Sequence, residues 1–467
     1  MDGFCSMTGT HRFARGSMDR AEIDAARPEP VSPLGALPEA RARMRETGQW
    51  HPLQSMGRRW PIGCVALEIT QRCNLDCTLC YLSDHSEAVK DIPLGEVFRR
   101  IDAIRAQYGA GTEVQVTGGD PTLRDRAELV QIIAHVRAAG MQPNLFTNGI
   151  RATRDLLTEL ASAGLADVAF HVDTTQERKG YPTEGSLHPV REEYIARAQG
   201  LGLRIVFNTT VHDGNLAEIP EIAAFFVRHA DAVSLASFQL QAETGRGAAG
   251  GSEGQVSMPR VITQLQRGVG AKISLDTPLA GHGECNRHAL TLVAGGAVLD
   301  LYDDKRVLAV LLDGTADMKF ERMRPWQAAL RFAARLATRP RLLLALAPWA
   351  VRKAWAFRAP VLAARGSVHR LAFFIHDFMD AGHLCRERIG ACVFMVQTAE
   401  GPISMCLHNA KRDAFILKPL QVAGAGWWDP LTGETGAAAS VSAAPALTKK
   451  TARGRRRIEI RHGARGG

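Results

Sequence analysis

The stretch EITQRCNLDCTLCYL, residues 68–82, places Cys73, Cys77 and Cys80 within eight positions. It overlaps the end of a short apolar run, CVALEIT (64–70), which has the composition of a buried strand. Soft thiolate ligands at such short spacings are typical of a metal site. The sequence therefore predicts a metal-binding loop at the end of the first strand.

The chain beyond this loop alternates between short apolar runs and segments of helical periodicity. Six strands separated by helices predict parallel pairing with right-handed crossovers, and hence an α/β fold built on a partial (β/α)6 barrel of the TIM type. Such barrels carry their chemistry on the loops at the carboxyl ends of the strands. The strands are expected at 64–70, 113–117, 143–147, 167–172, 204–211 and 232–240, and the helices near 94–108, 124–139, 153–163, 188–201 and 216–229.

Two kinds of metal site fit three clustered cysteines. A structural zinc site needs a fourth ligand to close a tetrahedron, and the nearest candidates are His85 and Cys64. An iron-sulfur cubane held by three cysteines keeps one iron open for a small molecule. The choice between them decides whether the site is structural or reactive.

The C-x3-C-x2-C spacing, with Tyr81 directly after the last cysteine and a preceding strand, resembles the signature of the radical S-adenosylmethionine (SAM) superfamily. The resemblance covers the chain from about Gly63 to Thr244. It implies a [4Fe-4S] cluster whose open iron binds SAM. It also implies that one electron from a reductant such as flavodoxin or ferredoxin cleaves SAM to a 5′-deoxyadenosyl radical, which abstracts hydrogen from a substrate.

Other strand ends match the same superfamily. In TGGDP (117–121), the resemblance implies that Gly118 and Gly119 bring backbone close to the methionine ammonium of SAM and that Asp120, in place of the usual Glu, pairs with it. Asp173 is expected at the ribose hydroxyls and Asn208 at the methionine carboxylate. Each of these residues, considered alone, is equally explained by a structural role in a turn, in a cap or as a hydrogen-bonded polar group of the core.

Four further cysteines lie outside this core: Cys285, Cys385, Cys392 and Cys406. A single buried cysteine usually packs as a small apolar residue. The superfamily resemblance instead implies an auxiliary iron-sulfur cluster, with Cys285, Cys392 and Cys406 as its expected ligands and Cys385, His408 or substrate as the fourth. The phrases IHDFMDA and ERIGACVFMVQTAEGPISMC, within 375–406, are similar to the C-terminal region of tetraether lipid synthases and methanopterin-modifying enzymes.

The segment 322–370 has an unusual composition. It holds eleven Arg and Lys residues, and no Asp or Glu occurs before Asp377. Its apolar run at 342–351 is too short to span a membrane and is interrupted by Pro348. Basic amphipathic helices rich in Trp and Leu can lie on an anionic membrane, here through Arg352, Lys353 and Arg358, although helices that cover the barrel with solvated arginines would look the same.

The remaining composition sets the domain organisation. The chain has 467 residues, 46% of them hydrophobic, and a net charge of +9. A basic tail without interleaved aromatics favours solubility over nucleic-acid binding. Clustered cysteines and the lack of a secretory signal pattern predict a cytoplasmic protein. We expect a disordered leader (1–57), the core barrel (58–255), an extension with Cys285 (256–320), basic helices (321–370), a cysteine-containing α+β region (371–420) and a disordered tail (421–467).

These features lead to three functional hypotheses. The first is a radical SAM enzyme that acts on a hydrophobic, lipid-like substrate to form a C–C bond or transfer a one-carbon unit, in peripheral contact with a membrane. The second is an enzyme that resembles molybdenum cofactor biosynthesis protein A or the peptide-modifying members of the superfamily. The third is a binding protein in which zinc or an inert cluster only stabilises the fold.

Overall fold

The computed structural model of the chain describes residues 16–32, 34–250, 256–276, 279–318 and 325–439. Its centre is a run of six parallel strands that neighbour one another in chain order. Each lies within two residues of its predicted bounds, so the predicted α/β class and the six predicted strands are confirmed. They are β1 (Cys64–Thr70), β2 (Glu113–Gly118), β3 (Gln142–Thr147), β4 (Asp167–His171), β5 (Arg204–Val211) and β6 (Val233–Leu240).

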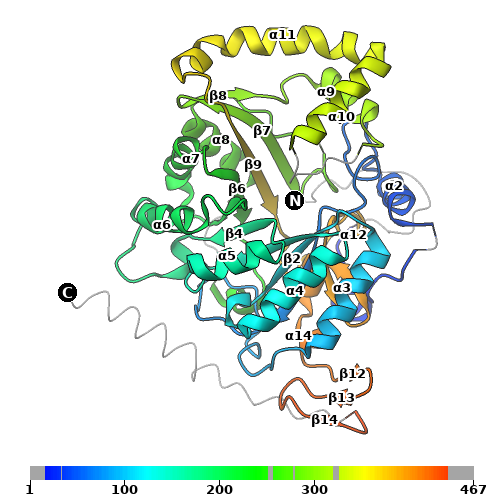
Figure 1. Cartoon of the computed structure of the whole chain (residues 1–467). Coiled ribbons are helices and arrows are strands. Elements are labelled where there is room, and N and C mark those ends of the chain that lie inside the picture. The colour runs from blue at the N-terminus through cyan, green and yellow to red at the C-terminus, as the bar shows by residue number, and fades with distance from the viewer. Residues whose placement is uncertain (1–15, 33, 251–255, 277–278, 319–324, 440–467) are drawn as a thin grey trace.

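Five helices connect these strands and cover the outer side of the sheet (Figure 1). In the first of them, Val97, Ile101 and Ile104 recur at helical spacing and are fully buried, so one apolar face packs on the strands. The five are α3 (Leu94–Tyr108), α4 (Arg126–Ala138), α5 (Arg154–Ser162), α6 (His188–Ala198) and α7 (Ile219–Arg228).

The C-terminal region extends both edges of this core. β9 (His369–Asp377) pairs in parallel with β6, whereas β10 (Phe394–Thr398) pairs in parallel with β1. Two consecutive strands thus lie at opposite edges, and the segment between them, with α12 (Arg386–Gly390), connects one edge to the other. Antiparallel strands complete an 11-stranded sheet, namely β7 (Asn286–Ala294), β8 (Ala297–Asp300) and β11 (Gly401–Ser404).

The N-terminal segment is folded, so the prediction of a disordered leader is wrong for its described residues from 16 to 57. α1 (Arg20–Ala25) and α2 (Ala36–Glu46) bury Ile23 and Met44, which are 2% and 1% exposed. The ammonium of Lys411 donates to three carbonyls at the end of α1. Apolar side chains at helical spacing explain this docking. Residues 1–15 lie outside the described ranges.

The predicted disordered tail is likewise wrong for residues 421–439, which contribute to a small antiparallel sheet with a buried Trp428. The rest of that predicted tail, residues 440–467, is not described. The small sheet consists of β12 (Leu420–Val422), β13 (Gly426–Trp428) and β14 (Thr435–Gly436).

The basic segment forms two helices, α10 (Pro325–Thr338) and α11 (Pro340–Ala363). Figure 1 shows α11 across the end of the molecule where β9 begins, far from the small sheet. Pro348 does not end α11, because it lies on the exposed side, where water can satisfy the carbonyl that proline leaves without a donor. The other helices are α8 (Met258–Val269), α9 (Lys305–Gly314), α13 (Met405–Ala410) and α14 (Asp413–Ile416).

Candidate active site

A cavity of about 1460 Å³ runs through the interior of the barrel. Cys73, Cys77 and Cys80 line it at the carboxyl ends of the strands. Their loop is held from two sides, because the Thr78 amide donates to the Thr175 carbonyl at 2.9 Å and the Gly247 amide donates to the Cys80 carbonyl at 2.9 Å. The three predicted ligands therefore share one wall of one cavity.

The electrostatics of these thiols favour a bound cation. Burial raises the pKa of Cys73 to about 11, and burial together with the neighbouring Cys80 raises the pKa of Cys77. Three adjacent thiols cannot all ionise without compensating positive charge. Within the described ranges, no three His, Cys, Asp or Glu side chains surround a common point as ligands of a single metal ion do. In a cubane cluster each thiol binds a different iron, so the three thiols need not surround a common point.

The two candidates for a fourth zinc ligand lie elsewhere. His85 Nδ1 pairs with Asp413 Oδ2 at 3.0 Å. Cys64 is the first residue of β1, about 20 Å from the end of that strand at the usual rise per residue. Among the described residues, neither side chain therefore completes a group of three metal ligands with these cysteines.

The glycines after β2 are required by a close approach of two backbones. A Cβ on Gly118, whose φ is +129°, would lie 1.9 Å from the Thr70 carbonyl oxygen, and one on Gly119 would lie 2.0 Å from that of Arg72. The Tyr81 hydroxyl donates to the Gly118 carbonyl at 2.7 Å. This turn is therefore packed directly against the cysteine loop, where backbone can meet a ligand.

Asp120 is fully buried and already has several protein donors. Its Oδ1 accepts from the amide and hydroxyl of Thr122, and its Oδ2 accepts from the Thr147 hydroxyl and the Asn148 amide, both at 2.8 Å. Asn148 in turn donates to Cys73 Sγ at 3.9 Å. Asp120 thus joins the ends of β2 and β3 beneath the cysteine loop, while its predicted contact with the SAM ammonium stays a prediction.

Asp173, the next predicted contact, is also buried. It accepts from His171 Nε2 at 2.6 Å and from the Thr210 amide at 2.7 Å. Burial disfavours its charge, but the neighbouring His171 and these hydrogen bonds outweigh that effect and hold the pKa of Asp173 well below its usual range. The carboxylate is fixed at the end of β4, and its contact with ribose stays a prediction.

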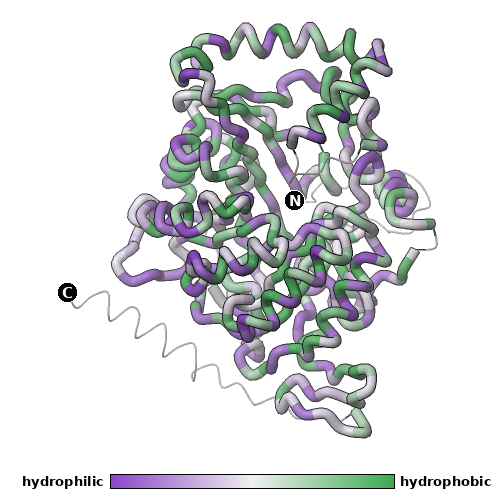
Figure 2. Tube along the Cα trace, in the orientation of Figure 1, coloured by the Kyte–Doolittle hydropathy of each residue, from purple (hydrophilic) through white to green (hydrophobic). Residues whose placement is uncertain are grey.

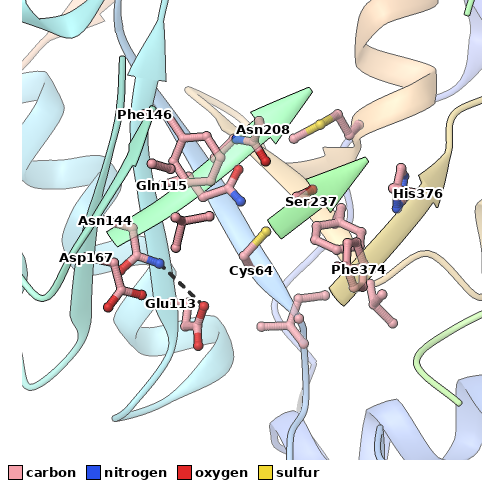
Figure 3. Close-up of a pocket in the computed structure, with 18 of the residues that line it drawn as sticks. Cys64, Glu113, Gln115, Asn144, Phe146, Asp167, Asn208, Ser237, Phe374 and His376 are labelled. Carbon is pink, nitrogen blue, oxygen red and sulfur yellow. Dashed lines mark hydrogen bonds between the residues drawn. The ribbon is translucent and has the colours of Figure 1, made fainter. Parts of the chain in front are cut away.

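Asn208 points into the cavity from the middle of β5, near Gln115 and Ser237 (Figure 3). Its amide has no side-chain hydrogen bond to another described residue. A polar group left in this state inside a barrel is available for a ligand.

Sequence reasoning missed His376, which lines the same cavity at the end of β9 (Figure 3). Asn286 Nδ2 donates to the Ala280 carbonyl at 2.7 Å, so its Oδ1 accepts from His376 Nδ1. Burial lowers the pKa of His376 to about 3, so the ring is neutral and Nε2 keeps its lone pair. His376 belongs to the motif IHDFMDA. Its position in the cavity could not be predicted, because the sequence did not show that this segment forms a strand paired with β6.

The second set of cysteines gathers where β9 ends and β10 begins. The Cys285 carbonyl accepts from the Asp377 amide at 2.8 Å, and Cys392 lies two residues before β10. Cys406 Sγ accepts from the Met379 amide at 3.5 Å. Burial raises the pKa of Cys285 to about 12 and also raises that of Cys406, and the charge of Cys392 contributes in the same direction to both. These three thiols therefore lie within electrostatic reach of one another.

Of the candidates for the fourth auxiliary ligand, Cys385 packs in the same apolar cluster as Cys406, whereas His408 lies beside Phe415, Glu68 and Arg412. Cys385 precedes α12 and forms a backbone bridge with Ser17. His408 stacks on Phe415, with ring centroids 5.2 Å apart, and burial lowers its pKa to about 4. Arg388 Nε donates to Cys285 Sγ at 3.2 Å and supplies a positive charge at that thiol.

Comparison with known proteins finds a family model that matches part of the core. Residues 67–226 match the model of the radical SAM superfamily. The PqqA peptide cyclase of Bradyrhizobium diazoefficiens is 30% identical over 179 residues, which are 38% of this chain and 46% of that protein. The 7,8-dihydro-6-hydroxymethylpterin dimethyltransferase of Methanocaldococcus jannaschii is 27% identical over 186 residues, 38% of this chain and 36% of that enzyme. The chain thus spans less than half of either relative.

Similar solved structures include Streptococcus suis SuiB, with 13% identity and a TM-score of 0.34 over 47% of each chain. The FeFe-hydrogenase maturase HydG of Carboxydothermus hydrogenoformans has 14% identity and a TM-score of 0.36, over 51% of this chain and 57% of that one.

Proposed function

Because residues 67–226 match the radical SAM superfamily, we propose that this chain is a radical SAM enzyme in which Cys73, Cys77 and Cys80 hold a [4Fe-4S] cluster with one iron open to SAM. The chemistry that cluster and SAM supply when bound is reductive cleavage to a 5′-deoxyadenosyl radical and abstraction of hydrogen from a substrate. The protein contributes the three thiolates, the glycine turn beside them, and a cavity that holds the cofactor and substrate next to each other.

The remaining site residues have distinct proposed roles. Asn208 offers its free amide to the methionine carboxylate. Asp173 is fully buried and accepts from the ribose hydroxyls only if one of its present donors, His171, Thr175 or Thr210, moves away. Tyr81 and Asp120 hold the surrounding loops, with Asp120 reaching the ammonium only if one of its present donors moves away. His376 Nε2 accepts a hydrogen bond from the substrate.

The proposed substrate is hydrophobic and lipid-like, modified by C–C bond formation or one-carbon transfer. The single observation that supports this is the continuity of the cavity, which joins the cysteine wall to an end lined by Leu308, Leu311, Leu312 and Met318, with Arg59, Tyr302 and Arg370 also in its lining. Phe146, Phe374 and Phe394 line its interior. An extended hydrocarbon chain suits such a space, with its reacting carbon near the cysteines.

The first experiment tests the cofactor. Each of Cys73→Ala, Cys77→Ala and Cys80→Ala should abolish formation of 5′-deoxyadenosine after anaerobic reconstitution and remove about one [4Fe-4S] equivalent of iron. Cys64→Ala is the matched control, because it removes a buried thiol outside the loop and should leave both readouts unchanged. Stoichiometric zinc without cleavage of SAM would instead support the binding protein.

We also propose an auxiliary iron-sulfur cluster held by Cys285, Cys392 and Cys406. Its support is the convergence of three buried thiols from separate segments. Alanine at any of the three should lower the iron content by about one cluster, with the cleavage of SAM retained. Cys385→Ala tests whether Cys385 is the fourth ligand. Loss of the same amount of iron would identify Cys385 as a ligand, and full retention of iron would exclude it. Unchanged iron in the other three variants would remove this cluster from the proposal.

A second candidate function, modification of a peptide, is favoured by the relatives named PqqA peptide cyclase. The two are separated by adding deuterated lipid or deuterated peptide fractions of cell extract to the reconstituted enzyme. Transfer of deuterium into 5′-deoxyadenosine from the lipid fraction supports the first, and transfer from the peptide fraction supports the second. Adding reduced flavodoxin or ferredoxin in the same assay tests the proposed electron donor.

A further inference from the structure

α11 carries a line of large apolar side chains on its solvent side. Leu344, Val351, Trp355 and Leu362 are 73%, 69%, 67% and 77% exposed. Their spacings of seven, four and seven residues bring them to one face of the helix, because a helix repeats every 3.6 residues. We call these four residues the outer stripe. In Figure 2, hydrophobic residues recur along this helix at the edge of the molecule.

The opposite side of α11 fixes the orientation of the outer stripe. Leu342, Leu346 and Phe357 are buried, and α11 packs on α9. Lys353 is also buried and pairs with Asp303 at 2.9 Å. The expectation that Lys353 contacts a membrane is therefore wrong, because its ammonium points inward. With this side held by the protein, the outer stripe remains in solvent.

The charges around the outer stripe indicate which kind of surface can bind it. Arg341 and Arg358 flank it on either side of the helix, and Arg358 stacks over the Trp355 ring at 3.8 Å. From Pro325 to Ala363 the sequence of α10 and α11 contains no acidic residue. A second copy of this surface would place arginine against arginine, which is repulsive. An anionic lipid surface offers both an apolar layer for the stripe and negative charge for the arginines.

We propose that α11 lies flat on an anionic membrane, with the outer stripe inserted among the acyl chains and the flanking arginines at the headgroups. The helix of 24 residues is about 36 Å long, enough for an extended contact in the plane of a membrane. Trp326 and Leu330 of the neighbouring helix α10 are each 62% exposed as well. No helix in the described part of the chain meets the length and hydropathy needed to cross a membrane.

This orientation also assigns a route for the substrate, a step that rests on the proposed function. α9 packs against α11 and also lines the cavity with Leu308, Leu311 and Leu312. The membrane would then face the end of the barrel opposite the cysteine loop. A lipid would enter from beneath α9 and extend toward Cys73, Cys77 and Cys80.

The test is flotation of the reconstituted full chain with vesicles of phosphatidylcholine alone or with phosphatidylglycerol. We expect binding only to the anionic vesicles, weakened at least tenfold in the double variant L344E/W355E. The matched control is V31E/L34E, which adds the same charge at residues 62% and 63% exposed and should bind as the unmodified chain does. The variant R341Q/R358Q should weaken binding to anionic vesicles, whereas K179Q/K272Q should not.

Insertion has its own readout. Fluorescence quenching by brominated lipids should fall on replacing Trp355 by Phe, which preserves an aromatic side chain. Equal binding of L344E/W355E and the control to anionic vesicles would overturn the proposal, as would a concentration-dependent dimer that only L344E/W355E abolishes. Because binding is measured without turnover, a chain that binds these vesicles but takes no deuterium from lipids would retain the membrane contact and lose the lipid substrate.

Discussion

At the scale of single residues, the chemistry depends on positions where one atom decides whether backbone or ligand fits. Gly119 is such a position, because a Cβ there would lie 2.0 Å from a carbonyl oxygen. We predict that Gly119→Ala lowers the free energy of unfolding by about 1–3 kcal/mol and weakens SAM binding. Gly95→Ala, at a helical glycine with no atom within 4 Å of the added Cβ, is the control and should cost nothing. Urea unfolding and equilibrium dialysis with SAM provide the measurements.

His376 gives a second prediction at this scale. Replacing it by Phe keeps the aromatic packing with Phe374 and Phe378 but removes the Nε2 lone pair. The ratio of substrate turnover to SAM cleavage should then fall about tenfold, because a hydrogen-bond acceptor at the substrate is lost while the cysteine loop stays intact. His369→Gln, at the other end of the same strand, should leave this ratio unchanged. An unchanged ratio in His376→Phe would exclude the proposed role.

At the scale of elements, the ends of β2 and β3 are joined through one carboxylate. Asp120→Asn replaces a carboxylate oxygen by an amide NH2 that faces other donors, so we expect a loss of about 2 kcal/mol in the free energy of unfolding. We also expect lower retention of iron, because Asn148, which donates to Cys73 Sγ, loses its hydrogen bond to Asp120. Asp125→Asn is the control, since asparagine still caps α4 there. If Asp120→Asn lowers the free energy of unfolding but leaves iron retention unchanged, the hydrogen bonds of Asp120 have a purely structural role.

The elements also show what could be predicted from the sequence. Strands such as RIVFNTTV and helices such as 94–108 have local periodicity, and their predicted bounds match the structure. The pairing of β10 with β1 depends on residues more than 300 positions apart, as Phe394 opposite Cys64 shows, and no local pattern encodes it. The cysteine loop was recognisable by spacing, whereas His376 and the several donors to Asp120 become apparent only when distant strand ends meet.

At the scale of the whole molecule, buried histidines predict acid lability. Burial lowers the pKa of His376 to about 3 and those of His188 and His408 to about 4, from an ordinary value of 6.5. The unfolded state therefore binds more protons, and the free energy of unfolding should fall as pH drops from 6.5 toward 4. His171 acts in the opposite sense, because its partner Asp173 raises its pKa despite burial.

The net effect is measurable by urea unfolding at about pH 7, 6 and 5. His408→Gln should flatten the decline by up to about 1.4 kcal/mol per pH unit, since it removes one of the groups that protonate only on unfolding. His135→Gln, at a partly exposed histidine with no comparable burial, serves as control. If the free energy of unfolding falls with pH equally steeply in the His408 variant and in the unmodified chain, His408 does not contribute to the acid lability.

The pairing of β10 with β1 also affects how the chain folds during synthesis. A ribosome releases the first strand long before the one that covers its free edge, so β1 would remain uncovered until residue 394 has emerged. Nascent chains stopped short of that point should therefore be prone to aggregation, even though the whole cysteine loop has already been translated.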